Sequence, residues 1–207
     1  MTKAPRTTPA ADASSTAVPP KQSASAAPAD GVLALVGRLL SDTLGQDTER
    51  LERVVSFAGR RLRGEFDVDG FGFDPELTEL VLLPMLRPLY RNWFRVEVRG
   101  VENIPDDGAA LIVANHSGTI PVDSLMTQLA IHDEHPRQRH LRTLAATLVF
   151  QLPVIADLAR KSGSTLACNE DAERLLAAGE LVGVWPEGFK GVGKPYSERY
   201  KLQRFGR

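Results

Sequence analysis

Residues 109–123 read AALIVANHSGTIPVD, and this stretch decides which fold the sequence predicts. Its first six residues are an apolar run with β-branched members, and an Asp-Asp-Gly turn precedes them. A run of this length and composition is typical of a strand that is buried on both faces. Pro121 then suits the first turn of a helix, and apolar residues recur downstream at helical spacing. The stretch therefore predicts a buried strand followed by a helix, the unit from which α/β sheets are built.

Two polar residues of this stretch, His116 and Asp123, are candidates for catalysis. His116 is expected at the carboxyl end of the strand and Asp123 just inside the helix, where open α/β sheets place their active sites. A carboxylate that fixes the tautomer of an imidazole leaves the other ring nitrogen free to take a proton. The pair therefore predicts a general base, although His–Asp pairs in loops are also common as ordinary surface groups.

A second motif of the same design, LVGVWPEGFK, occupies residues 181–190. It is another apolar strand pattern with polar groups at its carboxyl end. Strand patterns at 141–147 and 164–167 alternate with helical patterns between the two motifs, and residues 95–99 alternate at period two like an entry strand. This order predicts an α/β domain with a mainly parallel sheet flanked by helices. Both motifs are then expected at one edge of the sheet, where they share a cleft.

Together the two motifs resemble those of the glycerolipid acyltransferase family, which includes the 1-acylglycerol-3-phosphate acyltransferases. The resemblance implies a glycerol-3-phosphate acyltransferase-like fold, with His116 as the general base and Asp123 as the residue that orients it. Backbone amides near Ser117 and Gly118 are candidates for stabilising the oxyanion of an acyl transfer. The second motif stands where the family has Pro-Glu-Gly-Thr-Arg. This match implies an acceptor-binding block made of Glu187, Gly188, Phe189 and Lys190.

Two departures set this chain apart from the family pattern. Six residues separate His116 from Asp123, where the family has four, so their hydrogen bond depends on a longer loop. Lys190 stands at the position of the family's arginine, and Phe189 stands at that of its threonine. A lysine offers a point charge rather than a bidentate fork. The variant looks more like the branch that includes monoacylglycerol- and diacylglycerol-type acyltransferases.

The reaction that the resemblance implies is transfer of a fatty acyl group from acyl-CoA or acyl carrier protein. The acceptor is a hydroxyl of a glycerolipid or lysophospholipid, no covalent intermediate forms, and the acyl thioester is a co-substrate rather than a cofactor. One alternative is a lipid ester or thioester hydrolase that uses the same His–Asp pair. Another is a non-catalytic module that binds a lipid surface. The sequence has no Gly-x-Ser-x-Gly elbow, which argues against the usual serine hydrolase.

Two further patterns in the sequence resemble known binding motifs, but neither of them predicts a site. Residues 188–194 have the spacing of a phosphate-binding P-loop, but Pro195 follows where Ser or Thr is needed, so a nucleotide site is rejected. The His132-x-x-His135 pair has metal-ligand spacing, but it lies in a polar segment with a proline directly after it. We therefore expect no metal site.

Composition bounds the domain organisation. The chain has 207 residues, 43% of them hydrophobic, and a net charge of −1, which predicts one main core and no nucleic-acid partner. Cys168 is the single cysteine, so an internal disulfide is excluded.

We expect a disordered tail at 1–30, a helical region suited to a membrane interface at 31–94, and the acyltransferase domain at 95–207. The resemblance implies further strands after 207, so we expect a fragment that is incomplete at its C-terminus. No apolar run reaches the roughly 18 residues of a transmembrane helix, which predicts a peripheral protein on the cytoplasmic side of a membrane.

Overall fold

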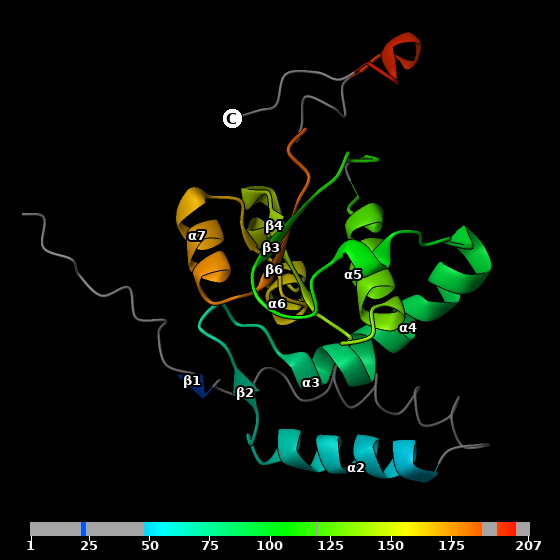
Figure 1. The fold of residues 1–207 in the computed structure, drawn as a ribbon. Coiled ribbons are helices and arrows are strands. Elements are labelled where there is room, and N and C mark those ends of the chain that lie inside the picture. Colours follow the sequence, from blue (N-terminus) through cyan, green and yellow to red (C-terminus); the bar gives the residue numbers. More distant parts are fainter. Residues whose placement is uncertain (1–21, 24–47, 119, 188–193, 202–207) are drawn as a thin grey trace, which may run out of the picture.

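The computed structural model describes residues 22–23, 48–118, 120–187 and 194–201 (Figure 1). Residues 31–47 of the expected helical region lie outside the described residues, as does the expected tail except for 22–23. In chain order the elements are β1 (Gln22–Ser23), α2 (Thr48–Leu62), β2 (Asp67–Val68), α3 (Pro75–Leu77), η1 (Thr78–Leu82), α4 (Leu83–Pro88), η2 (Leu89–Phe94), η3 (Val101–Asn103), β3 (Ala110–Val113), α5 (Val122–Glu134), β4 (Leu141–Ala145), η4 (Thr147–Gln151), α6 (Ile155–Lys161), β5 (Thr165–Leu166), α7 (Asn169–Ala177), β6 (Leu181–Val184) and η5 (Tyr196–Glu198).

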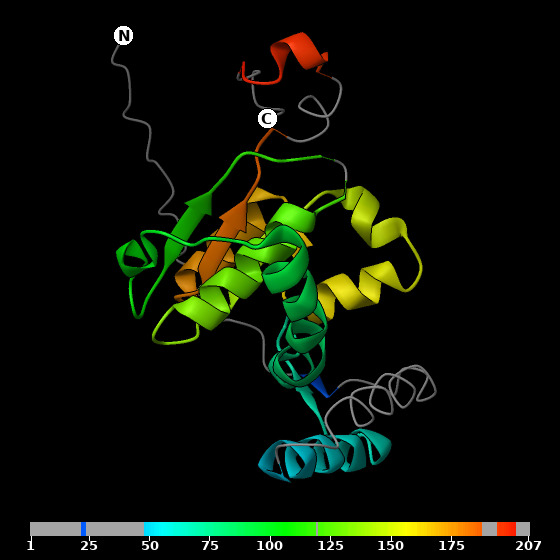
Figure 2. The same ribbon diagram turned by 90° about the vertical axis from the view of Figure 1, so that its right-hand side faces the viewer.

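A four-stranded parallel sheet in the order β3-β6-β4-β5 forms the centre of the fold. β6, the last of the strands in the described residues, inserts between β3 and β4 and pairs with both. The helices α5 and α7 lie on opposite faces of this sheet (Figures 1 and 2). The α/β fold with a mainly parallel sheet flanked by helices, which the sequence predicts, is confirmed.

The most buried strand is β6, whereas β3 lies at the outside of the sheet. Leu181 and Val182 of β6 are 0% exposed, and a Cβ added at Gly183 would approach Leu141 to 3.1 Å. Leu111 and Val113 of β3 are 49% and 58% exposed. The strand expected at 109–114 is therefore present, but the expectation that it is buried on both faces is wrong. The apolar run indicates that a strand forms. How deeply that strand is buried depends on its position in the sheet, and β3 is an edge strand.

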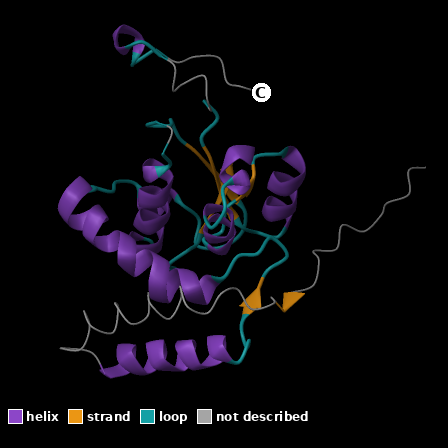
Figure 3. Cartoon of the chain, turned by 180° about the vertical axis from the view of Figure 1, so that it is seen from behind, coloured by secondary structure: helices purple, strands orange, loops and turns teal. Residues whose placement is uncertain are grey.

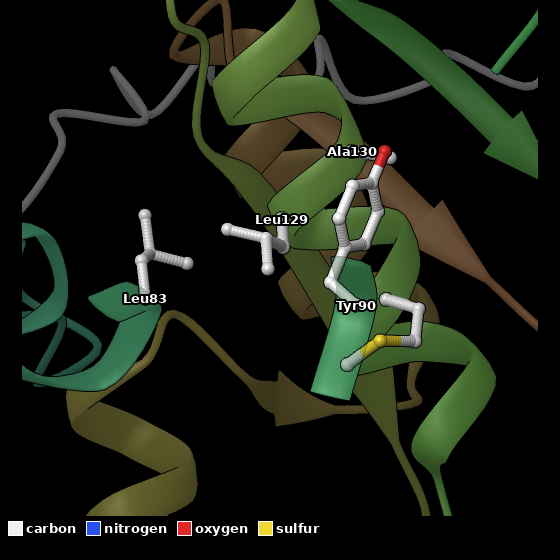
Figure 4. Packing of buried hydrophobic residues seen from close by; sticks show 5 residues of the cluster. Leu83, Tyr90, Leu129 and Ala130 are labelled. Atoms are coloured by element: carbon white, nitrogen blue, oxygen red, sulfur yellow. The ribbon is translucent and has the colours of Figure 1, made fainter. Parts of the chain in front are cut away.

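A long helical segment, α3 to η2, precedes the sheet and packs on α5. Its two internal prolines, Pro84 and Pro88, lack an amide hydrogen, and the backbone forms π-helical turns at 78–82 and 89–94. The core between this segment and α5 is an apolar cluster, part of which is shown in Figure 4. Its buried members are Leu83, Tyr90, Met126, Leu129 and Ala130.

The residues after this helix do not form the expected entry strand. Residues 95–100 have no strand pairing, and Val96 and Val98 pack instead against the cluster between α4 and α5. The period-two alternation therefore reflects an extended segment that covers the cluster with every second side chain.

A bidentate ion pair from Arg87 of α4 to Asp133 of α5, at 2.8 Å for both contacts, joins these two helices.

The amino-terminal helix α2 lies beyond α3 on the side away from the sheet (Figures 1 and 3). Val54 and Phe57 on α2 form a small core with Leu77 and Val81. Asp74, which is 0% exposed, accepts the amide of Leu77 at the start of α3 and pairs with Arg61 of α2 at 2.6 Å. This part of the chain therefore has its own core, separate from the sheet.

Candidate active site

The register of β3 and β6 places the two sequence motifs at one edge of the sheet. Val113 lies opposite Val184, and the amide of Ala114 continues the ladder by donating to the Val184 carbonyl at 3.1 Å. His116 comes three residues after Val113, and Glu187 comes three residues after Val184. The loops that carry them therefore leave the carboxyl ends of neighbouring parallel strands (Figure 2). This is the edge at which open α/β sheets bind ligands.

His116 and Asp123 form a direct hydrogen bond across the six-residue loop. His116 Nδ1 lies 2.7 Å from Asp123 Oδ2. The same oxygen accepts the amide of Ser117 at 2.7 Å, and Oδ1 accepts the amide of Ser124 at 2.9 Å. Because this carboxylate binds donors on both sides of the loop, two extra residues do not separate the pair.

The start of α5 fixes the position of the carboxylate. Pro121 is the residue before the helix, and its carbonyl accepts the hydroxyl of Ser124 at 2.9 Å. The hydroxyl of Thr127 donates to the carbonyl of Asp123 at 2.8 Å. Asp123 is in the first helical turn, where the helix dipole and the free amides favour a negative charge. The helix therefore holds the carboxylate in place beside the imidazole.

The electrostatics favour an ionised Asp123. Partial burial acts to raise the pKa of this carboxyl, but the His116 hydrogen bond, the Ser117 amide, the His116 charge and the Ser124 amide lower it, and the net pKa is below its ordinary value. An ionised carboxylate only accepts hydrogen bonds, so Nδ1 of His116 must be the donor. In the neutral ring, Nε2 then carries the free lone pair. The His116 side chain is 20% exposed, so an acceptor hydroxyl can approach it.

On the β6 side, Glu187 pairs with Lys194 rather than facing solvent. Glu187 is 5% exposed, and its Oε1 accepts Lys194 Nζ at 3.0 Å. Lys194 Nζ also donates to the carbonyl of Lys201 at 2.8 Å. Glu187 thus joins the two ends of the segment 188–193, and this ion pair is a feature that the sequence analysis missed. Gly188, Phe189 and Lys190, for which the family resemblance implies acceptor binding, lie outside the described residues.

The other histidine pair that the sequence offers, His132 and His135, contacts different partners. α5 continues to Glu134, so His132 is a buried helical residue rather than part of a polar loop. His135 Nε2 donates to the carbonyl of Ile104 at 3.1 Å, and the amide of Arg137 donates to its Nδ1 at 3.2 Å. His135 therefore anchors the loop after α5, and both of its ring nitrogens are used.

Apolar side chains follow the carboxyl end of β4 at the same edge of the sheet. The segment η4–α6 carries five exposed aliphatic residues, whose individual exposed fractions range from 44% to 78%. They are Leu148, Leu152, Val154, Ile155 and Leu158. Ile120, in the loop between His116 and Asp123, is 73% exposed. The candidate site thus combines an imidazole–carboxylate pair with apolar surface on nearby loops.

Comparison with protein families decides the family to which this arrangement belongs. A family model described as Acyltransferase matches residues 95–204, just over half of the chain, and this range includes both motifs. The chain belongs to the acyltransferase family. The family resemblance expected from the motifs is thereby confirmed.

Relatives of this acyltransferase chain include proteins whose function is not characterised. An uncharacterized protein of Mycobacterium tuberculosis (strain ATCC 25618 / H37Rv) is 59% identical over 154 residues, which cover 74% of this chain and 43% of that protein. An uncharacterized protein of Mycobacterium leprae is 54% identical over 164 residues, covering 79% of this chain and 45% of that protein. A Homo sapiens protein, named DGAT1/2-independent enzyme synthesizing storage lipids, is 33% identical over 100 residues, covering 47% of this chain and 29% of that protein.

The acyltransferase chain thus spans less than half the length of these mycobacterial relatives. No solved structure matches it. Within the part of the chain that the structure describes, none of the helices has both the length and the apolar character needed to cross a bilayer.

Proposed function

We propose that this chain carries the centre of an enzyme that transfers a fatty acyl group from an acyl thioester to a hydroxyl of a glycerolipid or lysophospholipid. The observation that supports the proposal most directly is the 2.7 Å contact from His116 to Asp123 in a chain of the acyltransferase family. The donor is acyl-CoA or acyl carrier protein, since a thiolate is a good leaving group.

In the proposed reaction His116 acts on the acceptor hydroxyl. Nε2 takes the hydroxyl proton as the oxygen attacks the thioester carbonyl, so a C–O bond forms while the carbonyl π bond opens. The tetrahedral intermediate collapses with cleavage of the C–S bond, and the imidazolium returns the proton to the departing sulfur. Asp123 stabilises the imidazolium and keeps Nδ1 protonated, the role that the aspartate has in Ser-His-Asp triads. No acyl-enzyme is required.

The oxyanion of the intermediate needs hydrogen-bond donors close to His116. The amide of Ser117 already donates to Asp123 at 2.7 Å, so it is not available for this role. Of the two amides near His116, those of Ser117 and Gly118, only the Gly118 amide is then a candidate donor to the oxyanion. The amides of the turn at Glu187 are the other candidates. Glu187 is 5% exposed and pairs with Lys194 at 3.0 Å, so we assign it the role of supporting this side of the site.

Two observations support a lipid acceptor. Apolar residues of η4–α6 are exposed beyond β4, at the edge where the β3 and β6 loops lie, and such a surface suits an acyl chain. The human relative is named as an enzyme that synthesizes storage lipids. Lys190 in place of arginine fits an acceptor without a phosphate group that needs bidentate binding. We therefore favour a neutral glyceride over lysophosphatidate.

The test is a direct assay of the chain with labelled acyl-CoA. Monoacylglycerol, diacylglycerol and lysophosphatidate are offered in parallel reactions, and the labelled products are separated by chromatography. We expect a labelled O-acyl ester that depends on acceptor, with the neutral glycerides preferred. Labelled free fatty acid that forms equally with and without acceptor would identify a hydrolase instead. Binding to lipid vesicles with no product from any acceptor would identify a non-catalytic lipid-binding module.

The proposal extends to a peripheral membrane position. Met85, Leu89 and Trp93 follow one another at four-residue spacing and are 48%, 46% and 73% exposed. Residues at this spacing lie on one face of a helix. Arg91 of the same segment is also mostly exposed. Exposed aromatic and aliphatic side chains with arginines are typical of helices that lie in a membrane interface. We name Met85, Leu89 and Trp93 the apolar stripe.

Replacing Trp93 with serine is expected to weaken binding to anionic lipid vesicles by about 10–150-fold, because burial of one large apolar side chain contributes roughly 1.5–3 kcal/mol. Co-sedimentation with phosphatidylglycerol-containing vesicles measures this change. Leu62→Ser is the matched control, since Leu62 is 61% exposed on α2, away from the apolar stripe. Equal vesicle binding by the wild type and both variants would contradict the membrane role of the stripe.

A further inference from the structure

Three side chains from separate segments meet outside the candidate active site. Glu79 comes from η1, His132 from the last turn of α5, and His140 from the residue before β4. One ligand atom from each lies within 4.8 Å of the other two. His140 precedes the amino end of β4, whereas His116 follows the carboxyl end of β3, so the cluster lies at the opposite edge of the sheet from the proposed base.

The hydrogen bonds leave a lone pair on His132 within this cluster, whereas His140 Nε2 donates to Glu79 and must release its proton when an ion binds. His132 Nδ1 lies 3.1 Å from Asp133 Oδ1, and Arg87 holds the Asp133 carboxylate through two contacts of 2.8 Å. A carboxylate that accepts from Nδ1 leaves Nε2 of His132 as the nitrogen with a free lone pair. Metal-binding histidines typically have such a carboxylate behind the ring, where it fixes the tautomer and the orientation. His132 therefore already has the outer contact that a ligand histidine requires.

The surroundings also provide space and charge. A small cavity of about 10 Å³ adjoins both rings and is lined in part by Thr78 and Gln128. This is close to the roughly 10–15 Å³ that one water molecule needs. Glu79 Oε1 lies 3.0 Å from His140 Nε2, so the carboxylate and the imidazole already face each other. The Glu79 side chain is 51% exposed, which gives an ion a path from solvent.

We propose that Glu79, His132 and His140 bind a divalent metal ion of the zinc class, with water in the remaining position. Two imidazoles and one carboxylate are a ligand set that Zn²⁺ accepts. Zinc bonds of about 2.0–2.2 Å place tetrahedral ligand atoms roughly 3.4 Å apart, so small side-chain rotations close the present spacing. The ion links η1, α5 and the start of β4. Its role is to hold the helical segment on the sheet, and it takes no part in acyl transfer.

The test is a Zn²⁺ titration of the untagged, metal-free full chain by isothermal calorimetry. We expect one equivalent to bind the wild type, and His140→Gln and Glu79→Gln each to weaken the Kd by more than 10-fold. Both residues are only partly buried, so these variants are expected to fold, which circular dichroism verifies. His116→Ala is the matched control, because it removes an imidazole outside the cluster and is expected to leave Zn²⁺ binding unchanged.

Cobalt provides a second readout that is independent of activity. Co²⁺ bound at the cluster is expected to give visible absorption bands that His140→Gln and Glu79→Gln abolish and that His116→Ala preserves. No Zn²⁺ binding by the wild type would overturn the proposal and leave Glu79 and His140 as a simple ion pair. Binding that survives both cluster variants, or that is lost with His116→Ala, would overturn it by placing the ion elsewhere.

Discussion

Replacing His116 with alanine is expected to lower the rate of acyl transfer by about 10²–10⁴-fold, the range by which a positioned general base accelerates proton transfer. The structure gives a reason for so large an effect. His116 Nδ1 is held by Asp123 at 2.7 Å, and the half-buried ring therefore presents Nε2 for the transfer. The change is expected mainly in kcat, because the proton is taken in the transition state rather than on binding. Initial rates over a range of acceptor concentrations measure it.

Added imidazole distinguishes a chemical role for His116 from a structural one. The alanine variant leaves space beside Asp123, and a diffusible base is expected to restore part of its turnover. The fold should persist, because the Asp123 carboxylate keeps its two amide contacts from Ser117 and Ser124. Asp107→Asn is the matched control, since Asp107 is 83% exposed at the amino end of β3. A folded His116→Ala protein with wild-type turnover would remove His116 from the mechanism.

The sequence predicts the His116–Asp123 contact for a local reason. Both residues lie at junctions that apolar periodicity and a helix-starting proline define, so the strand end and the helix start place them within reach of each other. The six-residue spacing departs from the family pattern, yet it matters little, because the carboxylate organises the loop through the Ser117 and Ser124 amides. Local signals were sufficient for this half of the site.

The features that sequence reasoning missed depend on contacts between distant segments. β6 comes last among the described strands but lies inside the sheet, and this strand order leaves Leu111 exposed although its run is apolar. Lys194 belongs to a P-loop-like spacing, and only the three-dimensional structure shows that it pairs with Glu187. In the same way His132 meets His140 rather than His135, since the loop after α5 turns the His135 ring toward Ile104.

Replacing Asp123 with asparagine is expected to lower turnover by roughly 10–150-fold, which is less than the loss expected for His116→Ala. A hydrogen bond to a charged group contributes about 1.5–3 kcal/mol, and each 1.36 kcal/mol is about tenfold in rate. Asparagine cannot replace the carboxylate, because His116 and Ser117 donate to one oxygen and Ser124 donates to the other. In either amide orientation its NH₂ group opposes a donor, and the charge that stabilises the imidazolium is lost.

The same variant has a pH signature in stability that a purely catalytic residue would lack. The pKa of Asp123 is lowered in the folded state, so its ionised form stabilises the fold above the unfolded-state pKa of about 3.9. This stabilisation is lost as the pH falls through the folded-state pKa. The wild type is therefore expected to unfold at a higher temperature than Asp123→Asn at pH 7, and the difference should shrink below about pH 4.

Thermal unfolding of both proteins from pH 7 to pH 3 measures this difference. The control is Asp107→Asn, whose carboxylate is mostly exposed and which should differ little from the wild type at any pH. A constant gap between wild type and Asp123→Asn from pH 7 to pH 3 would mean that the carboxylate charge does not hold this loop, and the assignment of Asp123 as the residue that orients His116 would fail with it.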